Sequence, residues 1–177
     1  IYMSLRSTIS RVLPRRFLSA YYDYEKAKRL SPEGRDLRAR DNGKTLGDDI
    51  SNDAAIALVM DWLCRAQDNS ATKDGGVARD FSLVDGWASS YPETTGYIIP
   101  TFLSEAGEGY RDDLGARAQR MTDWLVSIQL ESGAFQGGTV TQNPVVPVTF
   151  NTGQILIGLA AAASVFERPD YLDAMHK

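Results

Sequence analysis

The chain has 177 residues, of which 43% are hydrophobic and 10% aromatic, which is enough for one domain with a packed core and excludes a disordered chain. Residues 1–50 hold 11 Lys or Arg against 7 Asp or Glu, whereas residues 51–177 hold 8 against 16. This acidic body argues against a nucleic-acid partner, because phosphate contacts need a basic face.

Cysteine content and apolar runs bear on the compartment. The one cysteine, Cys64, cannot form an intrachain disulfide and is interpreted as a small buried hydrophobe. The longest apolar run, residues 155–166, has 12 residues, fewer than the roughly 18 of a membrane span. The first residues lack the apolar core of a signal peptide. We therefore expect a cytoplasmic protein with no membrane span.

The basic N-terminal part is predicted to be a helical extension covering residues 1–50, with LPRRFLSAYYDYEKAKRL forming one helix. A second domain, residues 51–177, follows. It begins with an amphipathic helix over 53–67, and Ser51 is a suitable N-cap just ahead of it.

An internal repeat organises this second domain. MDWLCRAQ at 60–67 and TDWLVSIQ at 122–129 share Asp, Trp, Leu and Gln at an offset of 62. A glycine turn follows each, and then an apolar run headed by Thr-Gly: TTGYIIPTFL, containing Thr95, and NTGQILIGLA, containing Thr152. ERPDYLDAMHK starts a third copy. The predicted order is outer helix, glycine loop and inner helix, about two and a half times, with the five extra residues of the first loop in its acidic and aromatic part.

The first inner helix is predicted over residues 91–105. Ser90 and Glu93 match an S-x-x-E capping box, and Pro92 suits the first turn. Pro100 is expected to kink the helix at Gly96, the residue four positions back, and Gly107 and Gly109 to end it. The second inner helix is apolar all round over 154–165, which predicts cover on every side.

The sequence resembles the repeat of α/α-toroid proteins in three features. These are helix ends of the form W-L-x-x-x-Q, a Gly-Ala-Phe loop at 133–135 and apolar inner helices. Two branches of these proteins share this repeat pattern: the terpenoid cyclase and protein prenyltransferase toroids, and the six-hairpin glycosidases. The resemblance implies an all-α fold, here an incomplete toroid from which the remaining hairpins are missing, and so a fragment of a longer protein.

The departures from these families restrict the chemistry. Squalene cyclases carry a D-x-D-D motif, whereas GDDIS at 47–51 has only paired aspartates. One cysteine and one histidine, His176, cannot build the zinc site of prenyltransferases, and GKTLG at 43–47 is no phosphate loop. We therefore expect no metal and no cofactor.

Helix N-termini of a toroid point their free amides at a central pocket. The expected site has Glu93 and Asp85 as catalytic carboxylates, and its expected substrate-binding residues are Trp87, Tyr91, Asn151 and Gln154. For Glu93 the alternative is helix capping, for Trp87 packing over its own loop, and for Thr95 and Thr152 caps or helix contacts are favoured over ligand binding.

Carboxylates beside aromatic faces are typical of sugar sites. The sequence therefore favours a protein of carbohydrate metabolism that acts on a poly- or oligosaccharide by Asp/Glu acid-base chemistry, as a glycosidase, lyase or epimerase. Two alternatives remain open: a cyclase-like toroid that binds an isoprenoid, and a non-catalytic carbohydrate-binding scaffold. Whether the chain is an enzyme is not decided by its sequence.

Overall fold

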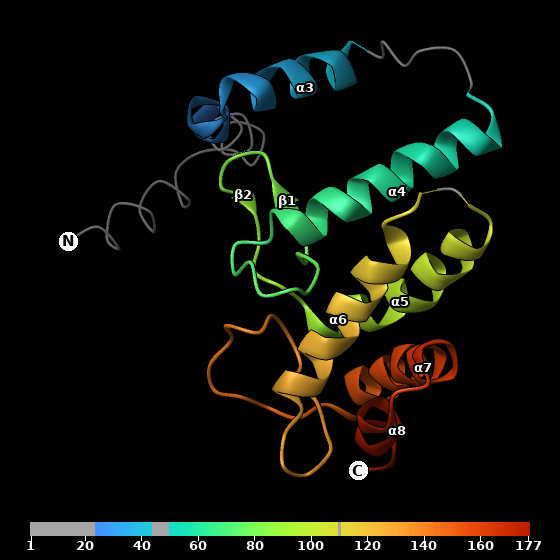
Figure 1. Cartoon of the computed structure of the whole chain (residues 1–177). Coiled ribbons are helices and arrows are strands. Elements are labelled where there is room, and N and C mark those ends of the chain that lie inside the picture. The colour runs from blue at the N-terminus through green and yellow to red at the C-terminus, as the bar shows by residue number, and fades with distance from the viewer. Residues whose placement is uncertain (1–23, 44–49, 110) are drawn as a thin grey trace. The chain divides into compact units, whose positions relative to one another are not determined.

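The computed structural model describes residues 24–43, 50–109 and 111–177, and most of these residues are helical (Figure 1). The prediction of a mainly helical chain is confirmed. The chain divides into two compact units: residues up to Asp49 together with Leu83–Gly86, and Ile50–Ser82 together with Trp87–Lys177. Each unit is described by itself.

In the first unit, residues 24–29 are helical and α3 spans Pro32–Asn42. Ser31 caps α3, because its Oγ accepts a hydrogen bond from the amide of Gly34 at 2.9 Å, and Pro32 occupies the first turn, where no amide partner is lost. The helix predicted for 13–30 lies mostly outside the described residues.

The second unit begins with α4, Asn52–Asp68. Ser51 is its N-cap, as predicted, with Oγ 3.3 Å from the amide of Ala54. After α4 the chain forms two short strands, β1, Phe81–Ser82, and β2, Gly86–Trp87, and residues 83–86 belong to the first unit.

Helix α5 spans Pro92–Gly107, close to the predicted bounds, but the predicted capping box is wrong. The N-cap is Tyr91, and no side chain caps the helix. Ser90 is fully buried and donates instead to Asp74 Oδ1 at 2.6 Å, while Ser70 Oγ lies 2.6 Å from Ser90 Oγ. A buried hydroxyl needs partners, and the turn of residues 70–74 supplies them at closer range than the helix end.

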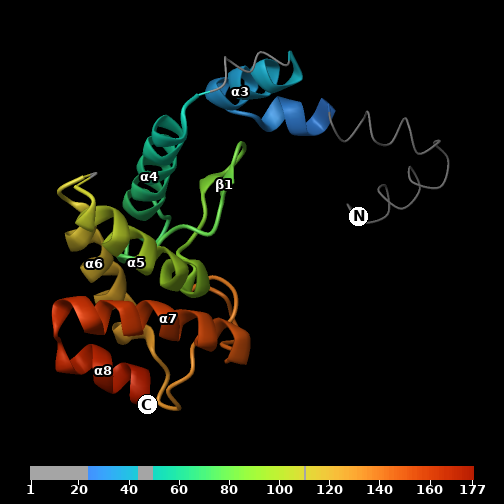
Figure 2. The same ribbon diagram turned by 90° about the vertical axis from the view of Figure 1, so that its right-hand side faces the viewer.

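Three further helices complete the unit: α6, Leu114–Ile128; α7, Thr149–Phe166; and α8, Pro169–His176. Helix α7 packs against α5 on one side and α8 on the other (Figure 2), and α6 contacts all three. The core contains the fully buried side chains of Phe102, Leu125, Phe135 and Tyr171.

The prediction that protein covers α7 on every side is wrong. Ile157 is 52% exposed and Val165 57% exposed. Among the described helices, only α7 is long and apolar enough, by length and composition, to cross a membrane, and core helices of soluble proteins pass the same test. The apolar run of residues 155–166 is shorter than α7, because residues 149–154 of the same helix include polar side chains.

Helices α5 and α7 cross closely at two glycines. A Cβ on Gly96 would lie 2.7 Å from Ile155 Cα, and a Cβ on Gly158 would lie 2.5 Å from the carbonyl oxygen of Gly96. The carbonyl of Gly96 receives no helical hydrogen bond from residue 100, because Pro100 has no amide hydrogen. Helix α5 nevertheless continues through Pro100 to Gly107. The kink predicted at this point stays a prediction, while the glycines explain how the two backbones approach.

The repeated sequence segments make matching hydrogen bonds. Thr95 Oγ1 accepts from the amide of Val77 at 3.0 Å and donates to the carbonyl of Tyr91 at 2.8 Å. Thr152 Oγ1 accepts from the amide of Phe135 at 2.9 Å and donates to the carbonyl of Val148 at 3.0 Å. Both threonines therefore tie an inner-helix first turn to the loop before it, as the helix-contact interpretation predicted.

The outer helices are linked by a second matching set. Asp61 of α4 pairs with Arg111, and Asp123 of α6 pairs with Arg168. Arg111 precedes α6 and Arg168 precedes α8, so an equivalent ion pair links α4 to the start of α6 and α6 to the start of α8.

Candidate functional site

A pocket of about 290 Å³ lies between α4, residues 77–80, Trp87 and α5. Its apolar lining comes from Leu63, Ala66, Val77 and Ile98. Its polar lining comes from Arg79, Asp80 and Thr94, and its aromatic lining from Trp62, Trp87 and Tyr97. The pocket thus joins apolar, aromatic and charged surface in one place.

Trp62 and Trp87 form the aromatic wall of the pocket. Their ring centroids are 4.7 Å apart with the planes inclined at 46°, and Phe81 packs edge-on against Trp87 at 4.9 Å. Trp87 thus packs over its own loop, the alternative interpretation of this residue, and lines the pocket as well. Trp62 is 43% exposed, so its ring is accessible to a ligand.

Sequence reasoning missed Trp62 because the repeat pairs it with Trp124. Trp124 is only 5% exposed and packs on Gly76, where an added Cβ would lie 2.5 Å from the indole. The repeat alone therefore gave no reason to treat the two tryptophans differently. Only the contacts distinguish the covered indole from the accessible one.

Glu93 is connected to this pocket through Tyr97 and accepts three hydrogen bonds. Its Oε2 accepts from Tyr91 Oη at 2.9 Å and from Asn151 Nδ2 at 2.7 Å. Its Oε1 accepts from Tyr97 Oη at 3.4 Å, and the Tyr97 side chain lines the pocket. The carboxylate is thus fixed by two inner helices, and the capping alternative for Glu93 is wrong.

Tyr91 is held as a hydrogen-bond donor. Burial raises the pKa of its phenol, and the hydrogen bond to Glu93 raises that pKa further, against an opposing effect of Asn151. Asn151 is only 5% exposed and comes from α7, 58 residues after Glu93. Three of the predicted site residues therefore form one hydrogen-bonded cluster.

Arg79 and Asp80 form an ion pair on the pocket rim, with side chains 53% and 49% exposed. Such an exposed pair contributes little to stability, because water screens it. Its charged groups are accessible to a polar ligand.

Of the six predicted site residues, only Trp87 lines the pocket. Glu93, Tyr91 and Asn151 form the hydrogen-bonded cluster that Tyr97 joins to the pocket. Asp85 and Gln154 belong to neither group. Asp85 is exposed in the segment between β1 and β2, and Gln154 is half-buried in α7, with its backbone carbonyl oxygen 3.3 Å from where a Cβ on Gly96 would lie. Their catalytic and binding roles stay predictions.

The insertion in the first loop also lies elsewhere than predicted. Gln67 bonds to Gly75, eight residues on, whereas Gln129 bonds to Gly133, four residues on. The isolated β-bridge between Ala78 and Ser90 encloses one residue more than the isolated β-bridge between Gln136 and Pro147. Four of the five extra residues thus enlarge the turn that carries the Ser90 partners, and only one lies in the part with Asp85 and Trp87.

A scan against protein-family models, a search of curated proteins and a search of solved structures each returned no match for this chain. Within the described residues, no three His, Cys, Asp or Glu side chains gather to hold a metal ion.

Proposed function

We propose that this chain is a carbohydrate-processing protein that binds a saccharide in the pocket between α4 and α5. The observation that carries the proposal is the placement of the Trp62 and Trp87 rings beside Tyr97, whose hydroxyl donates to Glu93. Flat aromatic faces suit the apolar C–H face of a sugar ring, and carboxylates suit its hydroxyl groups.

Glu93 has the role of general base in this proposal. Its carboxylate accepts three hydrogen bonds in a fixed orientation, which is how a proton acceptor is positioned for a substrate at the pocket edge. Asp80, which lines the same pocket, is the second carboxylate available to a substrate there. Such a pair suits glycosidase, lyase or epimerase chemistry.

The α/α-toroid architecture belongs to the same proposal. It is supported by the matching threonine and ion-pair contacts of successive hairpins, which are the contacts expected of a regular array of outer and inner helices. In a toroid of this kind further hairpins complete the ring, and the pocket lies at the end that carries the inner-helix N-termini.

The apolar lining favours one second candidate, an isoprenoid ligand. Leu63, Ala66, Val77 and Ile98 would contact a hydrocarbon chain, and the tryptophan faces would stabilise a developing carbocation. A saccharide bound without turnover would make the chain a scaffold rather than an enzyme.

Isothermal titration calorimetry separates these candidates. Neutral oligosaccharides, oligo-uronates and farnesyl diphosphate are titrated into the wild type, Trp62→Ala and Trp87→Ala. We expect heat with a saccharide and at least tenfold weaker binding for both variants. Phe150→Ala is the control, because Phe150 is 60% exposed on α7 and does not line the pocket. Heat with farnesyl diphosphate alone would assign the pocket to an isoprenoid, and equal binding by all variants would refute this site.

A further inference from the structure

An open apolar face runs along α7. The exposed positions Phe150, Gly153, Ile157, Ala160 and Ser164 recur at spacings of three and four, so they form one stripe on the helix. Phe150 is 60% exposed and Ile157 52% exposed. Two large exposed apolar side chains on one stripe with the small residues Gly153 and Ala160 indicate a contact surface.

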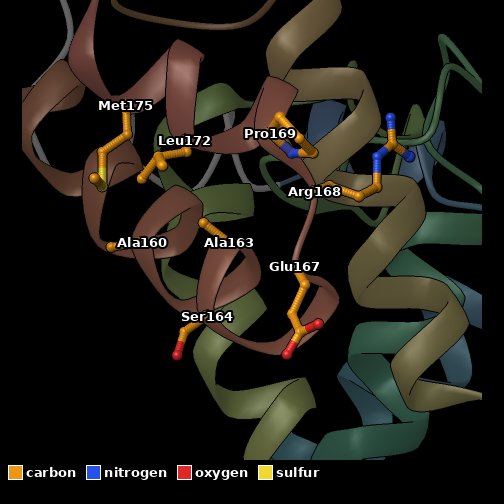
Figure 3. A pocket seen from close by; sticks show the side chains of 8 residues that line it. All are labelled: Ala160, Ala163, Ser164, Glu167, Arg168, Pro169, Leu172 and Met175. Carbon is orange, nitrogen blue, oxygen red and sulfur yellow. The ribbon is translucent and has the colours of Figure 1, made fainter.

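The stripe continues into a groove of about 450 Å³ between α7 and α8. Figure 3 shows Ala160 and Ala163 of α7 and Leu172 and Met175 of α8 around it. The α7 side of the groove has small side chains and the α8 side has larger ones. Another helix can therefore approach the α7 backbone closely.

The repeat indicates what fits this face. Gly153 stands 57 positions after Gly96, and Gly96 is the residue of α5 on which α7 itself packs. A Cβ on Gly96 would meet Ile155, whereas a Cβ on Gly153 would meet nothing within 4 Å. At this position α7 therefore presents to solvent a glycine equivalent to the one that α5 presents to α7.

We propose that this face receives an apolar helix of the same kind as α7, with a glycine opposite Gly153 in the way that Gly158 lies opposite Gly96. The partner is one more inner helix of the same repeat. The proposal rests on the repeat architecture proposed above, but not on what the pocket between α4 and α5 binds.

A second copy of the chain fits the face less well. Its equivalent inner helix is α5, and the residue 57 positions before Gly158 is Thr101. A Cβ at Gly158 would already lie 2.5 Å from the facing carbonyl oxygen, so Thr101 would hold the two helices apart. A lipid surface fits less well too, because α8 and its charged Arg168–Asp170 pair lie beside the groove.

The test extends this chain of 177 residues. Lys177 is equivalent to Arg120, so a copy of residues 121–166 fused after Lys177 completes one more repeat. We expect the extended chain to gain helical circular dichroism, melt at a higher temperature and bind less of the dye ANS than the natural chain. No gain in helix signal or melting temperature would overturn the proposal.

Gly153→Ala sharpens the test. In the natural chain we expect the same or a higher melting temperature, because alanine favours a helix and the space is open. In the extended chain we expect Gly153→Ala to lower the melting temperature, because the new Cβ meets the added helix. Gly115→Ala, also in open space, is the control and should act alike in both chains.

Three results would refute the partner. The first is an increase in melting temperature for Gly153→Ala in both chains. The second is dimerisation of the 177-residue chain in sedimentation velocity that Gly153→Leu abolishes. The third is flotation of the 177-residue chain with phosphatidylcholine vesicles that Ile157→Lys abolishes. The second would assign the face to another copy and the third to lipid.

Discussion

Gln67 and Gln129 make the same pair of hydrogen bonds at equivalent places in successive outer helices. Gln67 Nε2 donates to the carbonyls of Gly75 at 3.0 Å and Arg117 at 3.1 Å. Gln129 Nε2 donates to the carbonyls of Gly133 at 2.9 Å and Ala174 at 2.8 Å. Each glutamine therefore joins its own loop to the next outer helix.

Replacing either glutamine should destabilise the fold. Gln67→Ala removes the donor to the carbonyls of Gly75 and Arg117 and one of the acceptors of Arg117 and Arg120, so we expect a loss of about 2–3 kcal/mol of unfolding free energy. Gln129→Ala should cost about 1–2 kcal/mol because Gln129 is less buried. Urea denaturation measures both. Gln119→Ala, on α6, is the control, and an equal loss there would argue against the bridging role.

The glycine contact between α5 and α7 predicts opposite effects of one substitution at two sites. Gly96→Ala places a Cβ against the backbone of Ile155 and should cost about 1–3 kcal/mol. Gly115→Ala in α6 meets open space and should gain up to about 1 kcal/mol. Thermal melts followed by circular dichroism compare the two. A stabilising Gly96→Ala would mean that the helices are not in close contact there.

Glu93→Gln separates structure from chemistry. A glutamine oxygen can still accept from Tyr91 and Asn151, so the melting temperature should change little. Turnover of a saccharide should fall at least a hundredfold while binding persists, because the amide cannot take a proton. Glu93→Ala should in addition destabilise the fold, since it leaves the buried Asn151 amide without this acceptor. Full activity of Glu93→Gln would exclude Glu93 as the base.

The arginine cluster beside α4 predicts acid sensitivity. Hydrogen bonds from Arg111 and Arg117 lower the pKa of Asp113 to about 2 from an ordinary value of 3.8. Because the folded pKa is the lower one, this carboxylate stabilises the fold above about pH 4, and the contribution disappears as the pH falls toward 2.

Asp113→Asn should therefore reduce stability at pH 7 by about 1 kcal/mol or less, since the carboxylate is 41% exposed and water screens it. It should also flatten the decrease in melting temperature between pH 4 and pH 2. Asp112→Asn, next in the chain, is the control. An unchanged acid profile for Asp113→Asn would contradict the assignment.

Local signals in the sequence determined the elements of this fold. The Ser51 cap of α4 and the position of Pro92 in the first turn of α5 depend on backbone groups within a few residues, so the N-cap rule and the proline preference suffice to find them. The repeated Gln and Thr-Gly positions were equally visible, because each hairpin needs the same contacts to its neighbour.

Tertiary contacts decided the rest. Ser90 and Glu93 match a capping box in sequence, yet their partners are Asp74, 16 residues away, and Asn151, 58 residues away. Trp62 and Trp124 stand in the same motif, but the loop beside Gly76 covers only Trp124. Likewise, α7 has an apolar sequence all round, and only its packing on α5 and α8 leaves one face open. A side chain's partner or exposure depends on the segments that fold against it, and no local pattern specifies which of several equivalent positions they cover.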